Sequence, residues 1–254
     1  MSTANVAQPI VSGVLSVVMP VYNEMATLES IALKVLAIPQ LRELIIVDDC
    51  STDESANIAK RLLEKDCRIR YIRQPRNMGK TQALSAGFAS TSGDVVIVQD
   101  ADLEYDPAEI PEVIQPILDG QADVVYGSRF LVRKAARVLN FHHFLANKLL
   151  TFLSDLLTNL NLTDVETGYK ALRGEIIRNM IITSRGFGFE IEVTAKVAKL
   201  GCRVFETPIS YYGRTYAEGK KIGPADAFAA LWYIVRYNLF TSLRSSYRTL
   251  PRIG

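Results

Sequence analysis

Apolar and polar positions in the first half of the chain follow two alternating patterns. Short runs rich in Val, Ile and Leu, such as VLSVVMP (14–20), LRELIIVDD (41–49) and GDVVIVQD (93–100), are typical of strands buried on both faces. Longer segments between them repeat apolar residues every three or four positions, as Leu28, Ile31 and Val35 do. This alternation of buried strands and amphipathic helices predicts a mostly parallel sheet covered by helices on both faces.

The second half of the chain has a different texture. The segments 140–162 and 190–201 are predicted to form helices, the first with a wide apolar face. Between them, TDVETGYKALRGE (163–175) is polar and turn-rich, whereas CRVFETPISYYG (202–213) favours a strand. A basic loop and a final apolar helix follow, and Trp232 in that helix is expected in the core. Because no repeat or low-complexity linker interrupts the sequence, we expect one domain with a C-terminal elaboration.

Composition narrows the class of protein. The chain has 254 residues, of which 48% are hydrophobic, and a formal net charge of only +2, so binding to nucleic acid through bulk charge is not expected. Three widely spaced cysteines without a CxxC pair favour a reducing compartment over a disulfide framework. The N-terminus lacks the pattern of a signal peptide. The longest apolar run near the end, AFAALWYIV, is shorter than the roughly 20 residues that a membrane span needs.

Polar side chains gather where the predicted strands end. They are Tyr22 to Glu24, Asp48 and Asp49, Asp100 to Glu104, and Ser128 with Arg129. In parallel sheets of this kind, ligands bind beyond the carboxyl ends of the strands. We therefore expect the functional site at that edge of the sheet.

Three carboxylates follow the strand around Val96 at alternate positions, and they are Asp100, Asp102 and Glu104. If the chain stays extended there, the three side chains point the same way and repel one another unless a cation lies between them. Mg²⁺ and Mn²⁺ prefer such oxygen ligands, and Mg²⁺ usually takes one or two carboxylates and completes its shell with water and phosphate. The alternative is a set of ordinary loop acids, and for Asp106, which precedes a proline, helix capping is the preferred interpretation.

Several segments carry a resemblance to a known family when they are taken together and in order. They are VVMPVYNE, IIVDDCSTDES, RNMGKTQALSAG, QDADLEYDP, DVVYGSRF and TGYKALRGE. They resemble family 2 glycosyltransferases with the GT-A fold. The later segment GFEIEVTAKVAKLGCRVFETPISYYGRTYAEGKKI is similar to the dolichyl-phosphate mannose synthase and polyprenyl-phosphate glycosyltransferase branch of that family.

The resemblance implies an α/β GT-A fold, with a Rossmann-like, mostly parallel central sheet flanked by helices and a C-terminal helical elaboration. It implies an N-terminal extension over 1–13, a glycosyltransferase domain over 14–236 and a basic tail over 237–254. The implied reaction is an inverting, metal-dependent transfer of a hexose from a nucleotide diphosphate sugar, of the GDP-mannose or UDP-glucose type. The implied acceptor is a polyprenyl or dolichyl phosphate.

On the donor side, the resemblance implies that Asp100, Asp102 and Glu104 hold Mg²⁺ or Mn²⁺ against the departing diphosphate. Arg214 and Lys220, in the basic loop, would neutralise the same diphosphate and could close as a lid. The positions implied to contact the nucleotide sugar are Pro20, Tyr22, Glu24, Asp49, Asn77, Gly79, Lys80, Asp100, Arg214 and Lys220. The catalytic set implied in this way is Asp102, Arg129, Asp164 and Arg214.

On the acceptor side, the chemistry depends on what accepts the sugar. A lipid phosphate monoester has a second pKa near 6 and is a nucleophile at neutral pH, so cations that place it matter more than a general base. The residues implied to contact it are Ser128, Arg129, His143, Asn147 and Glu192. A sugar or protein hydroxyl would instead need a base, for which Asp164 is the candidate. Asp164 could equally orient the site.

Rival classes fit the same residues less well. A P-loop needs glycine where Gln74 stands, and a dinucleotide-binding enzyme needs GxGxxG after the first strand, where the chain has PVYNE. A non-catalytic nucleotide-sugar-binding protein remains the non-enzyme alternative. We expect a cytoplasmic protein, peripheral at the cytoplasmic face of the membrane, that contacts the bilayer through 141–160 and the arginine-bearing tail. Self-association into a homo-oligomer stays open.

Overall fold

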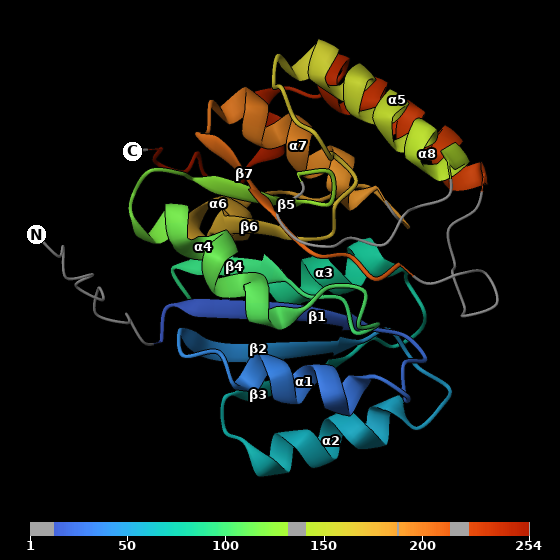
Figure 1. Ribbon diagram of the computed structural model, residues 1–254, viewed down its shortest axis with the longest axis vertical. Coiled ribbons are helices and arrows are strands. Elements are labelled where there is room, and N and C mark those ends of the chain that lie inside the picture. The colour runs from blue at the N-terminus through green and yellow to red at the C-terminus, as the bar shows by residue number, and fades with distance from the viewer. Residues whose placement is uncertain (1–12, 132–140, 187, 214–223, 254) are drawn as a thin grey trace, which may run out of the picture.

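The computed structural model describes residues 13–131, 141–186, 188–213 and 224–253 of the chain (Figure 1). The predicted N-terminal extension lies almost wholly outside these residues, and so does most of the basic loop. Arg214 and Lys220, both predicted to contact the donor, are therefore outside the described residues.

The described residues form a seven-stranded sheet with the order β3-β2-β1-β4-β6-β5-β7. Its strands are β1 (Leu15–Val21), β2 (Leu41–Asp48), β3 (Ile69–Arg73), β4 (Val95–Val98), β5 (Val124–Ser128), β6 (Lys170–Arg173) and β7 (Val204–Pro208). The pairs β1–β2, β1–β4, β2–β3 and β5–β7 are parallel, whereas β6 is antiparallel to both β4 and β5. The prediction of a mostly parallel sheet is confirmed.

Helices cover both faces of the sheet, because successive residues of each strand point to opposite sides. In β1, Val17 and Met19 join one hydrophobic cluster, whereas Val18 joins the other. The first cluster includes apolar residues of α1 (Leu28–Leu36), α2 (Ser55–Lys65) and α4 (Ile110–Leu118), the last preceded by the short 3₁₀ helix η1 (Pro107–Glu109). The second includes those of α3 (Lys80–Ala89), α6 (Gly174–Asn179), α7 (Phe189–Leu200) and α8 (Pro224–Leu239).

Strand β6 is the element that the sequence pattern does not reveal, because the segment 163–175 is polar and turn-rich. The four residues of β6 lie between β4 and β5, where Lys170 is fully buried. The Lys170 ammonium group donates hydrogen bonds to the carbonyl oxygens of Val165 (2.8 Å) and Thr167 (2.6 Å). These bonds compensate the burial of a charge that the hydrophobic pattern would not place in a central strand. This strand brings the preceding residues back to the carboxyl ends of β4 and β5.

Helices α5 (Phe141–Thr158) and α8 lie side by side at one end of the molecule (Figure 1). Trp232 on α8 is 57% exposed, so the expectation that it belongs to the core is wrong. A short helix, α9 (Leu243–Ser246), follows, and the buried Tyr247 forms a β-bridge with Met180, which attaches the end of the chain to the main body. In the part of the chain that is described, no helix is both long and apolar enough to cross a bilayer.

Candidate active site

The candidate site lies at the carboxyl ends of β4 and β5. Asp100 follows β4, and the Nζ atom of Lys80, at the start of α3, lies 2.9 Å from each of its carboxylate oxygens. The same Nζ atom is 3.5 Å from Oε1 of Glu190, near the start of α7. Burial disfavours the charged form of Lys80, but the attraction of Asp100 and Glu190 outweighs this and raises the pKa of Lys80. Lys80 is therefore a buried cation shared by two carboxylates.

The carboxylates that follow Asp100 do not continue the strand. Leu103 has a left-handed φ of 62°, and the backbone N–H of Glu104 donates to Oδ1 of Asp102 at 3.1 Å. The Glu104 side chain accepts a hydrogen bond of 2.8 Å from the Tyr211 hydroxyl. Alternation along an extended chain is therefore the wrong argument for these acids. Among the described residues, no group of three or more His, Cys, Asp or Glu side chains is arranged to hold a metal ion.

A smaller oxygen donor set fits a hard divalent cation. A Cβ atom at Gly168 would lie 2.9 Å from Oδ2 of Asp100, so glycine at this position leaves room beside that carboxylate. Asp100 and Asp102 are the carboxylates that such an ion would use, with phosphate and water oxygens completing its shell. Tyr211 donates to one oxygen of Glu104, and the participation of Glu104 in the metal site stays a prediction.

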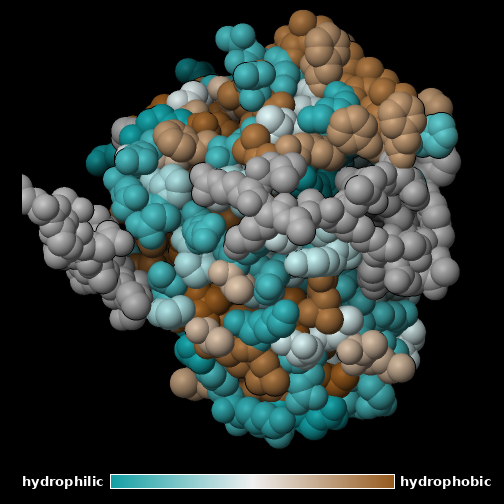
Figure 2. All heavy atoms as spheres, viewed as in Figure 1, coloured by the Kyte–Doolittle hydropathy of each residue, from teal (hydrophilic) through white to brown (hydrophobic). Residues whose placement is uncertain are grey.

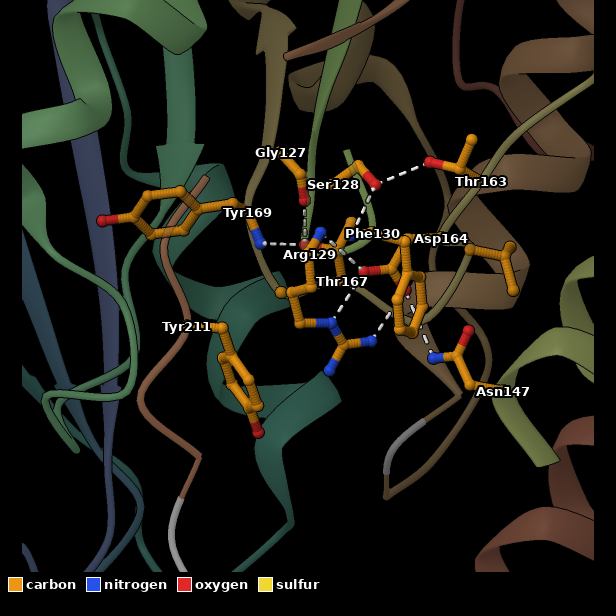
Figure 3. A network of polar contacts seen from close by, with 12 residues as sticks. Gly127, Ser128, Arg129, Phe130, Asn147, Thr163, Asp164, Thr167, Tyr169 and Tyr211 are labelled. Atoms are coloured by element: carbon orange, nitrogen blue, oxygen red, sulfur yellow. Dashed lines mark hydrogen bonds and ion pairs between the residues drawn. The ribbon is translucent and has the colours of Figure 1, made fainter. Parts of the chain in front are cut away.

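Arg129, which follows β5, is held in a fixed orientation by Asp164 (Figure 3). Its Nε and Nη2 atoms lie 2.6 and 2.7 Å from the two carboxylate oxygens of Asp164, and its backbone N–H donates to the same group at 3.1 Å. The Tyr211 ring lies 5.1 Å from the guanidinium carbon, and Asn147 of α5 donates to Asp164 at 3.2 Å. Burial alone would raise the pKa of Asp164, but the charge and hydrogen bonds of Arg129 lower it. Asp164 is thus an ion-paired carboxylate.

Ser128 and His143, predicted to contact the acceptor, are placed differently from Arg129. Ser128 is fully buried, and its hydroxyl lies 2.6 Å from the hydroxyl of Thr163 and accepts a bond of 3.1 Å from the Phe130 backbone (Figure 3). It therefore fixes the chain around Arg129. His143 is half-buried on α5, one turn before Asn147.

Asp49 holds the loop that begins α3. Its two carboxylate oxygens accept hydrogen bonds from the backbone N–H groups of Met78 and Gly79, each at 2.8 Å, and Gly79 has a φ of 88°. A conformation with that φ favours glycine, and it aims the first turn of α3 at Asp100. Contact of Asp49 with the nucleotide sugar stays a prediction, and its hydrogen bonds to Met78 and Gly79 show that it positions Lys80.

The other predicted nucleotide contacts lie along the same rim. Pro20 is partly buried in β1, Tyr22 and Glu24 follow that strand and are half-buried, and Asn77 is exposed beside the Gly79 turn.

Glu192 was predicted to contact the acceptor, but its carboxylate is fully buried and its hydrogen bonds stabilise a loop. It accepts hydrogen bonds from the backbone N–H groups of Thr183 and Ser184, at 2.7 to 3.0 Å, and lies 2.5 Å from Nζ of Lys196. Residues two apart on a helix do not share a face. Accordingly Glu190, and not Glu192, contacts Lys80.

Two further charged groups near Glu190, Glu166 and Lys170, are not predicted from the sequence to belong to the site. Burial and the negative charge of Glu190 raise the pKa of Glu166 to about 7, and burial lowers the pKa of Lys170 to about 8. Oε1 of Glu166 and Oε2 of Glu190 are buried and accept no hydrogen bond from any described residue. The available signal was the segment ETGYK (166–170), in which Glu166 precedes the antiparallel strand that the pattern missed and Lys170 begins it.

Comparisons with known proteins place this geometry in a family. The model of "Glycosyl transferase family 2" matches residues 16–181. The chain is 29% identical over 217 residues to an undecaprenyl-phosphate mannosyltransferase of Micrococcus luteus, covering 81% of this chain and 86% of that protein. It is 32% identical to a dolichol-phosphate mannosyltransferase of Pyrococcus furiosus over 82% of this chain, but spans only 59% of that longer protein.

The fold is also that of a solved glycosyltransferase. A crystal structure of glucosyl-3-phosphoglycerate synthase from Mycobacterium tuberculosis, in complex with Mn²⁺, UDP and phosphoglyceric acid, superposes with a TM-score of 0.66 at 23% identity. The match covers 90% of this chain and 79% of that one, which confirms the predicted GT-A architecture. The chain belongs to glycosyl transferase family 2 and is a glycosyltransferase.

Proposed function

We propose that the chain transfers one hexose, with inversion, from a nucleotide diphosphate sugar to a polyprenyl phosphate. The observation that carries this proposal is the Arg129–Asp164 pair, in which the Arg129 side chain is 12% exposed and its guanidinium is oriented by two short hydrogen bonds. A planar cation held in this way suits a phosphate group, which it can bind through two parallel hydrogen bonds. The mannosyltransferases to which the chain is similar are named for undecaprenyl and dolichol phosphate acceptors.

The pairing of Asp164 favours a phosphate acceptor over a hydroxyl. A hydroxyl acceptor needs a general base in hydrogen-bond reach, with a pKa near the working pH. Asp164 accepts from Arg129 on both oxygens and its pKa is lowered, so it is a poor base. A phosphate monoester needs no such base, because it is already a dianion near neutral pH.

On the donor side, Asp100 and Asp102 would hold Mg²⁺ or Mn²⁺, which stabilises the negative charge that develops on the departing diphosphate. The loop that Asp49 holds, with Asn77 and Gly79, would border the nucleoside. Arg214 and Lys220 would neutralise the diphosphate from the basic loop. Pro20, Tyr22 and Glu24 would border the nucleotide from the end of β1.

Membrane contact would come from the exposed apolar surface of α5 and α8. Figure 2 shows this surface as hydrophobic residues gathered over the two helices at the upper right of the molecule. We define the α5–α8 surface by its exposed apolar residues, which are Phe141, Phe144, Leu145, Leu149, Phe152, Leu156, Leu157, Phe228, Trp232, Val235 and Leu239. An amphipathic face of this kind suits peripheral binding at the bilayer interface, here at the cytoplasmic face.

A transfer assay tests the proposal. Purified protein with Mn²⁺ or Mg²⁺ is given a panel of nucleotide sugars and a short polyprenyl phosphate, and release of nucleotide diphosphate is measured with and without the lipid. Lipid-dependent release with one donor is expected, and Asp102→Asn should lower it about 100-fold or more. The matched control is Asp106→Asn in the same loop, because Asp106 caps the next helix through the Ala108 N–H and should matter little to transfer.

Two results would contradict the proposal. Donor turnover that is independent of the lipid but requires an added sugar or protein with a free hydroxyl would show that the acceptor is not a lipid phosphate. Unchanged turnover by Asp102→Asn in the presence of excess EDTA would show that the reaction needs no metal.

A further inference from the structure

Lys80 lies where a cation bound to Asp100 would compete with it. Its Nζ atom is 2.9 Å from both Oδ1 and Oδ2 of Asp100, so a single ammonium group engages the whole carboxylate. The Lys80 side chain is 19% exposed and that of Asp100 is 17% exposed, so the attraction between them is only weakly screened by water. A divalent ion that binds Asp100 must therefore displace this ammonium group or share the carboxylate with it.

Displacement from a buried site requires another counterion close by, because an unpaired buried charge is costly. Glu190 supplies one. Its Oε1 atom is 3.5 Å from Nζ of Lys80, and its side chain is 6% exposed. Its Oε2 atom is buried and accepts no hydrogen bond from the described residues, although native structures seldom leave such an acceptor unsatisfied.

The charges around Glu190 leave room for a second cation. Glu166 repels Glu190, and one oxygen of Glu166 is also buried and unsatisfied. The buried Lys170 attracts both carboxylates, so two acids share one ammonium group before Lys80 is counted. The loop 184–186 fixes the start of α3 against α7, since Thr81 donates to the Gly186 carbonyl at 2.8 Å and the Gln82 amide donates to that of Ser184 at 3.2 Å. The backbone of Lys80 is thus held, and only its flexible side chain has to move.

We propose that Lys80 is an internal stand-in for the metal. Its ammonium group pairs with Asp100 until the divalent ion binds, and then moves to pair with Glu190. This inference rests on the proposed function in one respect, that a divalent ion binds Asp100. Lys80 keeps the carboxylate neutralised in the donor-free enzyme, and Glu190 is a positioning residue that lowers the cost of releasing it. The affinity for the metal then depends on how much less stable the Lys80–Glu190 ion pair is than the Lys80–Asp100 ion pair.

The test is a Mn²⁺ titration of the full chain without donor, with free Mn²⁺ measured by electron paramagnetic resonance. Lys80→Met should tighten Mn²⁺ binding about tenfold, because Asp100 loses its competitor. Glu190→Gln should weaken binding about tenfold, because Lys80 loses its second carboxylate. In the Lys80→Met background, Glu190→Gln should change the Kd much less, since its effect acts through the lysine. Lys80→Gln is a second variant with the same expectation, and thermal melts verify that each protein is folded.

The double-mutant comparison separates this inference from simple charge effects. If Glu190→Gln weakens Mn²⁺ binding equally with and without Lys80, Glu190 acts only as a nearby negative charge and the inference is wrong. If Lys80→Met leaves the Kd unchanged or weakens binding, the stand-in role is also wrong.

The control is Asp102→Asn, which should weaken Mn²⁺ binding in each background. If Asp102→Asn weakens Mn²⁺ binding but Lys80→Met leaves the Kd unchanged, this inference is wrong and the proposed function still stands. Binding that is absent from every variant and from the parent protein would overturn both.

Discussion

The guanidinium of Arg129 is oriented before any ligand arrives, because three groups constrain it. Asp164 accepts two of its hydrogen bonds, the Tyr211 ring lies 5.1 Å from its central carbon, and Asn147 bonds to the same carboxylate. Such preorganisation lowers the entropy that binding a phosphate would otherwise cost. Lysine could not replace Arg129 here, since a single ammonium group cannot pair with Asp164 through a planar fork and face a ligand as well.

A conservative change at Asp164 tests whether it positions Arg129 or acts as a base. Asp164→Asn keeps the shape but removes the charge, so we expect kcat/KM for the lipid phosphate to fall about 10- to 100-fold, mainly through KM. Because Arg129 lowers the pKa of Asp164, its stabilising charge is fully present above about pH 4 and is lost only as the pH falls through that lower value. The shape of the pH–rate profile between pH 6 and 9 should therefore be the same in the variant.

The control at this site is Asn147→Ala, which removes one neutral hydrogen bond to Asp164 and should cost only a few-fold in kcat/KM. Loss of a pH-dependent limb in Asp164→Asn, with KM unchanged, would instead identify Asp164 as the base of a hydroxyl-transfer reaction.

At the scale of elements, the sequence predicts strands and helices that are long enough to show a hydrophobic period, but not very short strands. The alternation of apolar runs predicts β1, β2 and β4 and the helices between them, since each run is long enough to show its period. Strand β6 has four residues, and its buried Lys170 contradicts the usual pattern of a buried strand. Without β6 in place, the pairing of Arg129 with Asp164 could not be foreseen, although both residues were predicted to belong to the site.

The same limit applies to the individual acids. Asp100 and Asp102 were found from their position after a buried strand. Glu192 was placed on the acceptor side by the resemblance, which does not show that its carboxylate is buried against the backbone of Thr183 and Ser184. The role of Asp49 in holding the Gly79 turn could not be predicted, because the hydrogen bonds that it accepts from Met78 and Gly79 depend on backbone geometry that no pattern shows.

Helix α3 carries Lys80 and packs on the sheet through Gly87, which provides a test at this scale. A Cβ atom at Gly87 would lie 2.3 Å from Cγ1 of Val18 and 3.1 Å from Cγ2 of Val47, both buried in the core. Gly87→Ala should therefore lower the free energy of unfolding by about 1–3 kcal/mol, even though alanine favours helix by about 1 kcal/mol. Urea unfolding measures the change.

Ser85→Ala, on the half-buried part of the same helix, is the control and should shift the free energy of unfolding by less than about 0.5 kcal/mol. Val18→Ala should cost less in the Gly87→Ala background than alone, because it removes the clashing methyl group. A stabilised Gly87→Ala protein would show that α3 can move away from β1.

At the scale of the whole molecule, the apolar surface and the candidate acceptor site share one helix. Asn147 of α5 bonds to Asp164, while Leu149 and Phe152 of the same helix belong to the α5–α8 surface. Exposed side chains of this size are unfavourable in water, and a continuous group of them marks an interaction surface. Docking α5 on a bilayer would bring the headgroup of a lipid phosphate toward Arg129 without requiring the lipid tail to leave the membrane.

The only tryptophan of the chain gives a direct measure of that docking. Trp232 belongs to the α5–α8 surface and is 57% exposed, so its fluorescence should shift to shorter wavelength when anionic phospholipid vesicles are added. Inserting one Leu or Phe side chain contributes about 1.5–3 kcal/mol, so the double variant Leu149→Ser/Phe152→Ser should need at least about tenfold more lipid for the same shift.

The matched control is Leu33→Ser/Leu63→Ser, which changes two apolar residues that are exposed on α1 and α2 at the opposite end of the molecule (Figure 1). It should behave as the parent protein, because those helices would face away from the bilayer. A shift that follows protein concentration without lipid, and that Leu149→Ser/Phe152→Ser abolishes, would show that the α5–α8 surface joins two copies of the chain. The lipid would then have to reach Arg129 by another route, since the side of α5 that bears Leu149 and Phe152 would be covered.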